Sequence, residues 1–160
     1  MKRLNLIRTL ALTATFAASA LLFTACNDND DDNMDNQSYS LSGNASGSQE
    51  VPAVTTSATG AISGSYNAMS NSLTYTINWN GLSNIVTGLH IHGPANVGAE
   101  AGVIHPLTIT TNGVAGTATG TLTLADSTET HLLNGRLYFN IHTALNTDGE
   151  IRGQITAIEN

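Results

Sequence analysis

Two histidines, His90 and His92, stand two residues apart in the segment 89–94, which reads Leu-His-Ile-His-Gly-Pro. The alternation of apolar and polar residues is typical of a half-buried strand, so both imidazoles are expected on one face. A third histidine, His142, ends the alternating segment 136–142. Imidazole is the commonest metal ligand in proteins, and three imidazoles suit copper or zinc. If the two strands share a sheet, the three histidines form a candidate metal site.

Glu150 is the candidate fourth ligand. It opens the predicted strand 149–158, and the short link 143–149, which contains Asp148-Gly149, predicts a hairpin with the preceding strand. Alternation with a period of two then places Glu150 on the polar face of the histidines. Asn140, on the same face, is an alternative fourth ligand or a supporting residue. The competing interpretation is structural, with the histidines bonded to turn carbonyls and to nearby Thr or Asn side chains.

Arg152 competes for the same acidic residues. It is one of only two basic residues after position 25, and a rare cation in an acidic domain is expected to be paired. A bidentate bridge from Arg152 to Glu50 or Glu150 would join the N-terminal part of the domain to the last strand. We predict a structural ion pair between Glu50 and Arg152. If Glu150 takes that role instead, it is not available as a metal ligand.

From residue 38 onward the sequence predicts short strands separated by turns. The clearest strand is 72–79, in which every second residue is large and apolar. Further strands are expected at 39–42, 58–66, 86–92, 103–110, 115–124, 136–142 and 149–158, and one or two helical turns, opening with Asp126 as the capping residue, at 126–134. About eight short strands of this kind predict an all-β fold, an antiparallel β-sandwich or barrel.

The N-terminal segment predicts a lipoprotein. Residues 1–25 combine three basic residues with an apolar run of signal-peptide length, and small residues precede Cys26, the single cysteine of the chain. We expect cleavage before Cys26 and its lipidation, which anchors the protein to a membrane of the bacterial cell envelope, facing the periplasm or the cell surface. Residues 26–37 predict an acidic, disordered tether. The domain itself is expected over 38–160.

The charge balance excludes one class of partner. Without residues 1–25, two arginines remain against twelve acidic residues, a net charge of −10 with neutral histidines. So acidic a protein has no electrostatic footprint for nucleic acid, and we predict no nucleic-acid partner. Charge also provides no attraction to an anionic membrane surface, so membrane attachment is expected to depend on the lipid at Cys26.

Five short motifs run through the domain in a fixed order: Gln49-Glu50-Val51-Pro52, Ala58-Thr59-Gly60, His90-Ile91-His92-Gly93-Pro94-Ala95, Asn134-Gly135-Arg136-Leu137-Tyr138-Phe139-Asn140-Ile141-His142-Thr143 and Gly149-Glu150-Ile151-Arg152-Gly153-Gln154. Over residues 41–158 they resemble the CHRD domain, which is named for chordin and is widespread in bacterial secreted proteins. The sequence departs from the family pattern in two loops, where proline is more usual at Ala53 and within 146–148. The resemblance implies an immunoglobulin-like β-sandwich akin to the copper/zinc superoxide dismutases, and it implies no settled activity.

Three function classes follow. The interpretation we favour from the sequence is a non-catalytic extracytoplasmic binding module for an unknown ligand, with a protein or glycan partner recognised by loops such as 93–102. The alternative is binding or buffering of copper or zinc by His90, His92 and His142 with Glu150. A dismutase-like enzyme comes third, because a binuclear site needs about seven ligands, whereas the chain has five histidines, and because the acidic surface repels superoxide.

Overall fold

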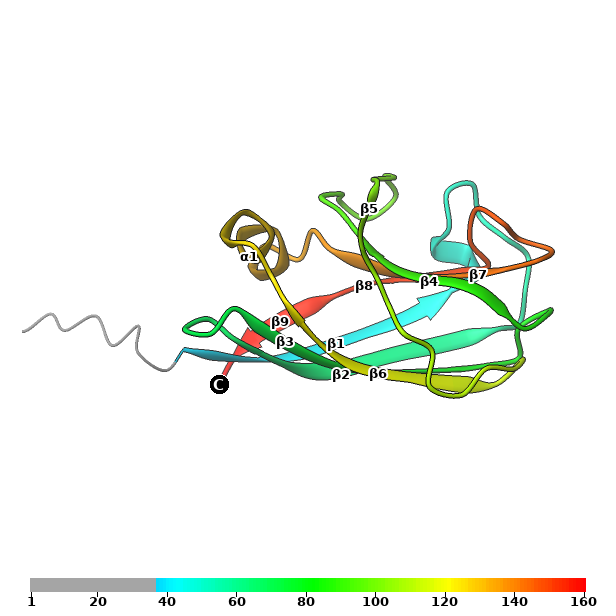
Figure 1. Cartoon of the computed structure of the whole chain (residues 1–160). Coiled ribbons are helices and arrows are strands. Elements are labelled where there is room, and N and C mark those ends of the chain that lie inside the picture. The colour runs from blue at the N-terminus through cyan, green and yellow to red at the C-terminus, as the bar shows by residue number, and fades with distance from the viewer. Residues whose placement is uncertain (1–36) are drawn as a thin grey trace, which may run out of the picture. The chain divides into compact units, whose positions relative to one another are not determined.

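The fold is seen in a computed structural model that describes residues 37–160 (Figure 1). The predicted signal segment, Cys26 and nearly all of the tether lie outside this range. Within it, no helix has the length and apolar character needed to cross a membrane.

Nine strands, one α-helix and one 3₁₀ turn follow one another along the described chain. They are β1 (Ser38–Ser46), the turn η2 (Gly47–Gln49), β2 (Thr59–Asn67), β3 (Ser72–Asn80), β4 (Val86–His92), β5 (Val103–Pro106), β6 (Gly116–Thr123), α1 (Asp126–Leu133), β7 (Tyr138–Thr143), β8 (Ile151–Gln154) and β9 (Thr156–Glu159). All the strand pairs are antiparallel.

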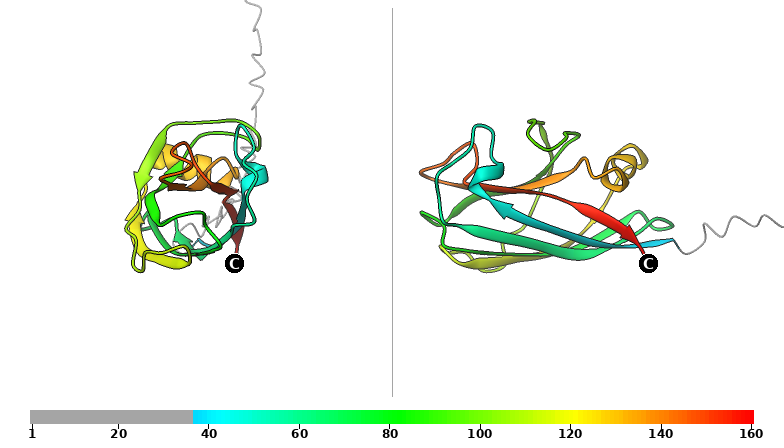
Figure 2. Two further views of the ribbon diagram at one scale, coloured as in Figure 1. Left: turned by 90° about the vertical axis from the view of Figure 1, so that its right-hand side faces the viewer. Right: turned by 180° about the vertical axis from the view of Figure 1, so that it is seen from behind.

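The strands form one curled sheet that folds over into two layers. The strand order is β5-β4-β7-β8-β1-β2-β3-β6, and β9 pairs with β1 beside this path. Figures 1 and 2 show β4, β7 and β8 facing the layer of β1, β2, β3 and β6 across the interior. Only Ser46 of β1 pairs with β8, at Arg152, so the two layers are joined by a single rung there.

Alternation in sequence builds the core between the layers. In β3, Leu73, Tyr75, Ile77 and Trp79 are all buried, while the residues between them face outward. In β7, Phe139 and Ile141 are fully buried on the inner face. Every second residue of these strands therefore faces the core, as a period of two requires. The outer face of β7 carries polar side chains.

The predicted all-β antiparallel fold is confirmed, with nine strands instead of about eight. The additional strand arises because the segment expected at 149–158 is interrupted at Ile155. There the backbone N–H donates to the carbonyl of Leu137, after which β9 pairs with β1 instead. The helix at 126–134 is also confirmed, although its N-cap is Ala125, so Asp126 lies in its first turn and is not the capping residue.

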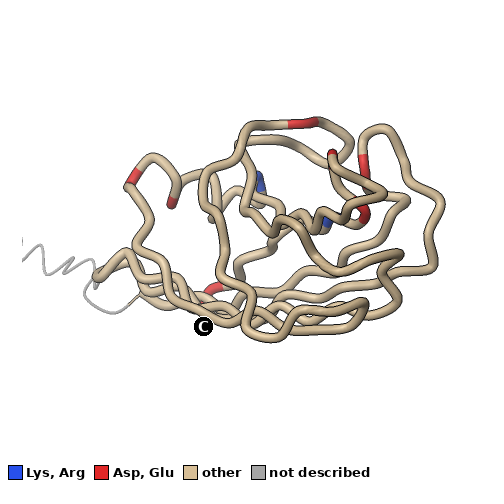
Figure 3. The backbone as a smooth tube through the Cα atoms, turned by 45° about the vertical axis from the view of Figure 1, so that its right-hand side comes forward, with Lys and Arg blue, Asp and Glu red and all other residues tan. Residues whose placement is uncertain are grey.

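Charged residues are sparse and unevenly placed in the described domain (Figure 3). Strands β1, β2, β3 and β6 contain none, and their outer faces are rich in Ser, Thr and Asn. Both arginines and most acids belong to the opposite layer or to loops. The charged side chains of the described domain are therefore found mainly in the loops and in the layer that contains β4, β7 and β8.

Candidate metal centre

The three histidines come from the neighbouring strands β4 and β7. Leu89 and Ile91 face the core and are buried, so His90 and His92 point outward from β4. The register sets His90 opposite Asn140 and His92 opposite Tyr138, with Gly88 opposite His142. The expected sharing of one sheet is therefore correct, and the two strands turn all three imidazoles to the same face.

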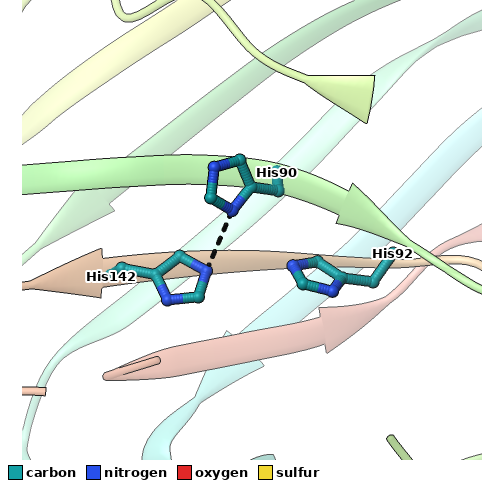
Figure 4. A group of neighbouring side chains, drawn as sticks. All are labelled: His90, His92 and His142. Carbon is teal, nitrogen blue, oxygen red and sulfur yellow. Dashed lines mark hydrogen bonds between the residues drawn. The ribbon is translucent and has the colours of Figure 1, made fainter. Parts of the chain in front are cut away.

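The imidazoles converge closely enough to share one ligand (Figure 4). One ring nitrogen from each histidine can be chosen so that all three lie within 4.8 Å of one another. The closest pair is His90 Nδ1 and His142 Nε2, which are 3.1 Å apart. Nitrogens at tetrahedral angles on a metal with bonds of ~2.0–2.1 Å are separated by roughly 3.4 Å.

Gly88 makes this approach possible. A Cβ atom at Gly88 would lie 3.0 Å from Cε1 of His90 and 3.5 Å from Cδ2 of His142. The strand also has a register irregularity between Val86 and Gly88. A side chain at position 88 would thus crowd the rings, which sequence alternation alone does not reveal.

Backbone carbonyls fix the orientation of two of the rings. His92 Nδ1 lies 3.0 Å from the carbonyl oxygen of Ala101, and His142 Nδ1 lies 2.9 Å from that of Thr147. A carbonyl only accepts, so both Nδ1 atoms carry the hydrogen and both Nε2 atoms keep a lone pair. A histidine that binds a metal usually has the same arrangement: one ring nitrogen donates to an acceptor in the protein, and the other nitrogen ligates the metal.

His92 Nε2 is buried and has no hydrogen-bond partner among the described residues. The side chain is only 8% exposed. Buried polar atoms without partners are rare because each carries an uncompensated desolvation cost. A metal ion at the centre of the three rings would remove that cost.

Burial keeps the three imidazoles neutral. It lowers the pKa of His90, His92 and His142 below the ordinary value of 6.5. Neighbouring imidazoles lower these pKa values further, because two positive rings at this distance repel each other. Neutral imidazole is the form that binds metal.

Glu150 does not join the histidines, and the expected placement on their face is wrong. Its fully buried carboxylate accepts hydrogen bonds from Thr56 Oγ1, from both the N–H and Oγ of Ser83, and from Thr143 Oγ1. Thr143 follows His142 on β7 and therefore points to the opposite face. The alternation does not extend to Glu150 because β8 begins only at Ile151, so Glu150 belongs to the turn that contains Gly149, where φ is +133°.

Asn140, the other candidate for a fourth ligand, remains on the histidine face. It is 4% exposed and stands opposite His90 on one side and Arg152 on the other. Its Nδ2 donates to the carbonyl of Asp148 at 3.3 Å, whereas its Oδ1 is buried without a partner. His105 and His131 are outside the cluster.

The predicted ion pair between Glu50 and Arg152 is not formed. Arg152 donates instead to the carbonyl of Ala99 at 2.8 Å, and its guanidinium carbon lies 3.8 Å from the centre of the Tyr138 ring. Glu50 Oε1 is buried without a hydrogen-bond partner. Burial raises the pKa of Glu50 to about 7, and the nearby charge of Arg152 offsets only part of that effect. The sequence predicted that Arg152 pairs with Glu50, whereas in the structure its guanidinium packs on the ring of Tyr138, which faces the same side of the sheet.

Tyr138 is a functional neighbour that the sequence did not identify, and the loop 93–102, which the sequence predicted as a recognition loop, lies beside it. The loop returns over the histidine face, and its carbonyls at Ala99 and Ala101 meet Arg152, Tyr138 and His92. The signal available was the position of Tyr138, which shares the polar phase of Asn140 and His142 on one strand.

Comparison with known proteins agrees with the resemblance seen in the motifs. The model of the CHRD domain matches residues 41–155, which include all three histidines and strands β2 to β8. No curated protein and no solved structure matched the chain. Since the match covers most of the sequence, the chain belongs to the CHRD domain family.

Proposed function

We propose that the domain binds one copper or zinc ion through His90, His92 and His142. The observation that carries this proposal is the convergence of three imidazole nitrogens within 4.8 Å. Their residue types match the ligand preferences of both metals, and the choice between the metals depends on availability as much as on affinity.

The hydrogen bonds around the cluster support binding over a purely structural role. A structural histidine uses both ring nitrogens in hydrogen bonds, whereas His92 uses Nδ1 and leaves Nε2 buried and unpartnered. His142 differs, because its Nδ1 donates to Thr147 and its Nε2 accepts from His90, but that Nε2 also faces the cluster. The rings are thus already arranged for ligation, which lowers the entropic cost of binding a metal.

The proposed role is to hold or buffer the metal without catalysis. The CHRD domain is not a known enzyme family. Glu150, which would have added an acid or base beside the metal, is fully engaged by Thr56, Ser83 and Thr143.

The sequence also suggested that loop 93–102 recognises a protein or glycan. The base of this loop is tied to the histidine face through Ala95, Ala99 and Ala101, which accept from Gln154, Arg152 and His92 respectively. These contacts favour a loop that covers and supports the histidines. For this reason we favour metal binding over a recognition module.

We further propose that lipid on Cys26 places this metal-binding domain at the bacterial cell envelope. The support is the sequence alone, namely the basic and apolar segment followed by small residues and Cys26.

Metal titration tests the proposal. The chain with Cys26→Ser, which removes the competing thiol, is titrated with Zn(II) and Cu(II) by calorimetry, beside His92→Ala and His142→Ala in the same background. We expect one ion per chain with micromolar or tighter affinity, weakened in both variants by more than the 10–100-fold, roughly, that loss of a supporting residue produces. His105→Ala is the matched control and should bind normally. A wild-type domain that binds neither ion overturns the proposal.

A further inference from the structure

The geometry points to a positioning unit for His92, in which Tyr138 and Arg152 clamp the loop 93–102 so that its Ala101 carbonyl holds His92 in the Nδ1–H tautomer. The purpose of this unit rests on the proposed metal binding. The fixed Nδ1–H tautomer of His92, which we call the tautomer lock, is a property of the metal-free protein.

Tyr138 positions His92 in two ways, directly through its ring and indirectly through Ala101. Its ring stacks on the imidazole, with the two ring centres 5.0 Å apart and the planes inclined by 14°. Its hydroxyl accepts from the N–H of Ala101 at 3.1 Å and donates to the carbonyl of Ala101 at 3.2 Å. That same carbonyl accepts from His92 Nδ1 at 3.0 Å. Tyr138 therefore fixes both the plane of the imidazole and the position of its hydrogen-bond acceptor.

Arg152 braces the arrangement from β8, the strand on the other side of β7. Its guanidinium carbon lies 3.8 Å from the centre of the Tyr138 ring, and its Nη2 donates to the carbonyl of Ala99 at 2.8 Å. Ala99 stands two residues before Ala101 in the same loop. Arg152 is itself only 3% exposed, so the cation–π contact is formed in a poorly solvated place, where such contacts are strongest.

The consequence for ligation is specific. A neutral imidazole carries one hydrogen, and in free histidine that hydrogen favours Nε2. A carbonyl opposite Nδ1 reverses this preference, because the carbonyl has no hydrogen to offer and must receive one. With Nδ1 protonated, the lone pair of His92 is on Nε2, the buried atom that has no partner among residues 37–160. The loop thus decides which nitrogen His92 presents to a metal.

The lock is read directly from the imidazole ¹⁵N shifts of the metal-free, ¹⁵N-labelled Cys26→Ser chain, using long-range ¹H–¹⁵N spectra. We expect His92 to be purely Nδ1–H in this chain. Tyr138→Phe keeps the ring and removes the hydroxyl, so we expect a mixture of tautomers and Zn(II) affinity reduced by about 10–100-fold. Tyr39→Phe, the same change on β1 in the opposite layer, is the matched control and should alter neither.

Arg152→Met is the second variant, and it should also mix the tautomers of His92 because Ala99 loses its donor. Should Tyr138→Phe fail to fold, as judged by circular dichroism, this variant gives the answer. A pure Nδ1–H tautomer in the folded variants, or an Nε2–H tautomer in the Cys26→Ser chain, overturns the inference. If the lock is present in that chain but Zn(II) and Cu(II) do not bind, the proposed function fails and the lock stands.

Discussion

His90 Nδ1 lies 3.1 Å from His142 Nε2, across two neighbouring strands and 52 positions apart in the sequence. Because His142 donates its Nδ1 hydrogen to Thr147, its Nε2 is the acceptor in this contact. The hydrogen between the two rings therefore belongs to His90. For His90 to hold a metal through Nδ1, that hydrogen would have to move to its Nε2, and the ion would then occupy the position of the hydrogen between the two rings.

Metal binding should persist to lower pH than it does for ordinary histidine ligands. Burial lowers the pKa of all three imidazoles below 6.5, so they stay neutral at pH 7 and protons compete with the metal only in more acidic solution. We expect the Zn(II) dissociation constant to be nearly constant from pH 8 to pH 7 and to rise only once the pH falls below the ordinary imidazole pKa of 6.5. Calorimetry at four pH values measures this. A loss of affinity that begins already between pH 8 and pH 7 contradicts it.

Replacing Glu150 by Gln should destabilise the domain strongly. The buried carboxylate joins the loops around Thr56 and Ser83 to the end of β7 at Thr143, and an amide leaves donors facing donors there. Burial raises the pKa of Glu150, but hydrogen bonds from Ser83, Thr143 and Thr56 outweigh it, so the net pKa lies below the ordinary value of 4.5. Its stabilisation is therefore present above pH 4.5 and is lost as pH falls through the lowered pKa.

We expect Glu150→Gln to lower the free energy of unfolding at pH 7 by about 2–4 kcal/mol, measured by urea denaturation. Glu159→Gln, at an exposed position of β9, is the control and should change it little. Equal stability of the two variants would show that the carboxylate network contributes nothing.

The sequence predicted the elements well and the ends of the elements poorly. Alternation predicts His90, His92 and His142 on one face because the register between β4 and β7 runs without a shift from the pair Gly88–His142 to the pair His92–Tyr138. The prediction for Glu150 is wrong because the residue lies in the turn before β8, next to a glycine with φ of +133°, where strand alternation does not apply. Alternation says nothing about such a residue in advance.

The contacts of Arg152 also could not be predicted from the sequence. Charge pairing favoured Glu50, whereas packing placed the ring of Tyr138 and the carbonyl of Ala99 within reach of the guanidinium. Which of several polar groups an arginine meets depends on the course of a loop. The loop 93–102 has few apolar residues whose burial would have predicted its path.

Gly149→Ala should cost more stability than an alanine elsewhere in the loops. A Cβ there would lie 2.5 Å from Asn140 Oδ1 and 2.7 Å from Glu50 Oε1, and φ is +133°. We expect a loss of about 2–3 kcal/mol in the free energy of unfolding. Gly98→Ala, with φ of +80° but no atom within 4 Å, isolates the backbone strain, and Gly102→Ala has neither problem. If all three variants are equally stable, the crowding at position 149 has no energetic consequence.

Cys26→Ser should release the protein from the membrane. Lipidation contributes ~0.8 kcal/mol for each buried methylene, so several acyl chains on one cysteine anchor a domain firmly. In bacterial cells that express the natural chain, we expect incorporation of labelled palmitate and recovery in the detergent phase on partitioning. The variant should incorporate none and move to the aqueous phase. Recovery of the natural chain in the aqueous phase without label would exclude the lipoprotein interpretation.

Glu50→Gln should stabilise the domain at alkaline pH and leave it unchanged in acid. Burial raises the pKa of Glu50 from 4.5 to about 7, so the folded state prefers the protonated carboxyl. Stability from this preference is fully present below pH 4.5 and is lost as pH rises through about 7. A shift of this size corresponds to about 3 kcal/mol at most, at 1.36 kcal/mol for each pKa unit. The amide of Gln is neutral at every pH and avoids the loss.

Urea unfolding of the wild type and Glu50→Gln at pH 5, 6, 7 and 8 measures this difference. The two free energies should be similar at pH 5 and diverge toward pH 8, with the variant more stable. Glu159→Gln should follow the wild type throughout, because position 159 is exposed and its charge is not among those that act on Glu50. Curves for Glu50→Gln and wild type that stay parallel from pH 5 to pH 8 would show that Glu50 is ionised in the folded protein. In that case Arg152 compensates its charge despite being held by Tyr138 and Ala99.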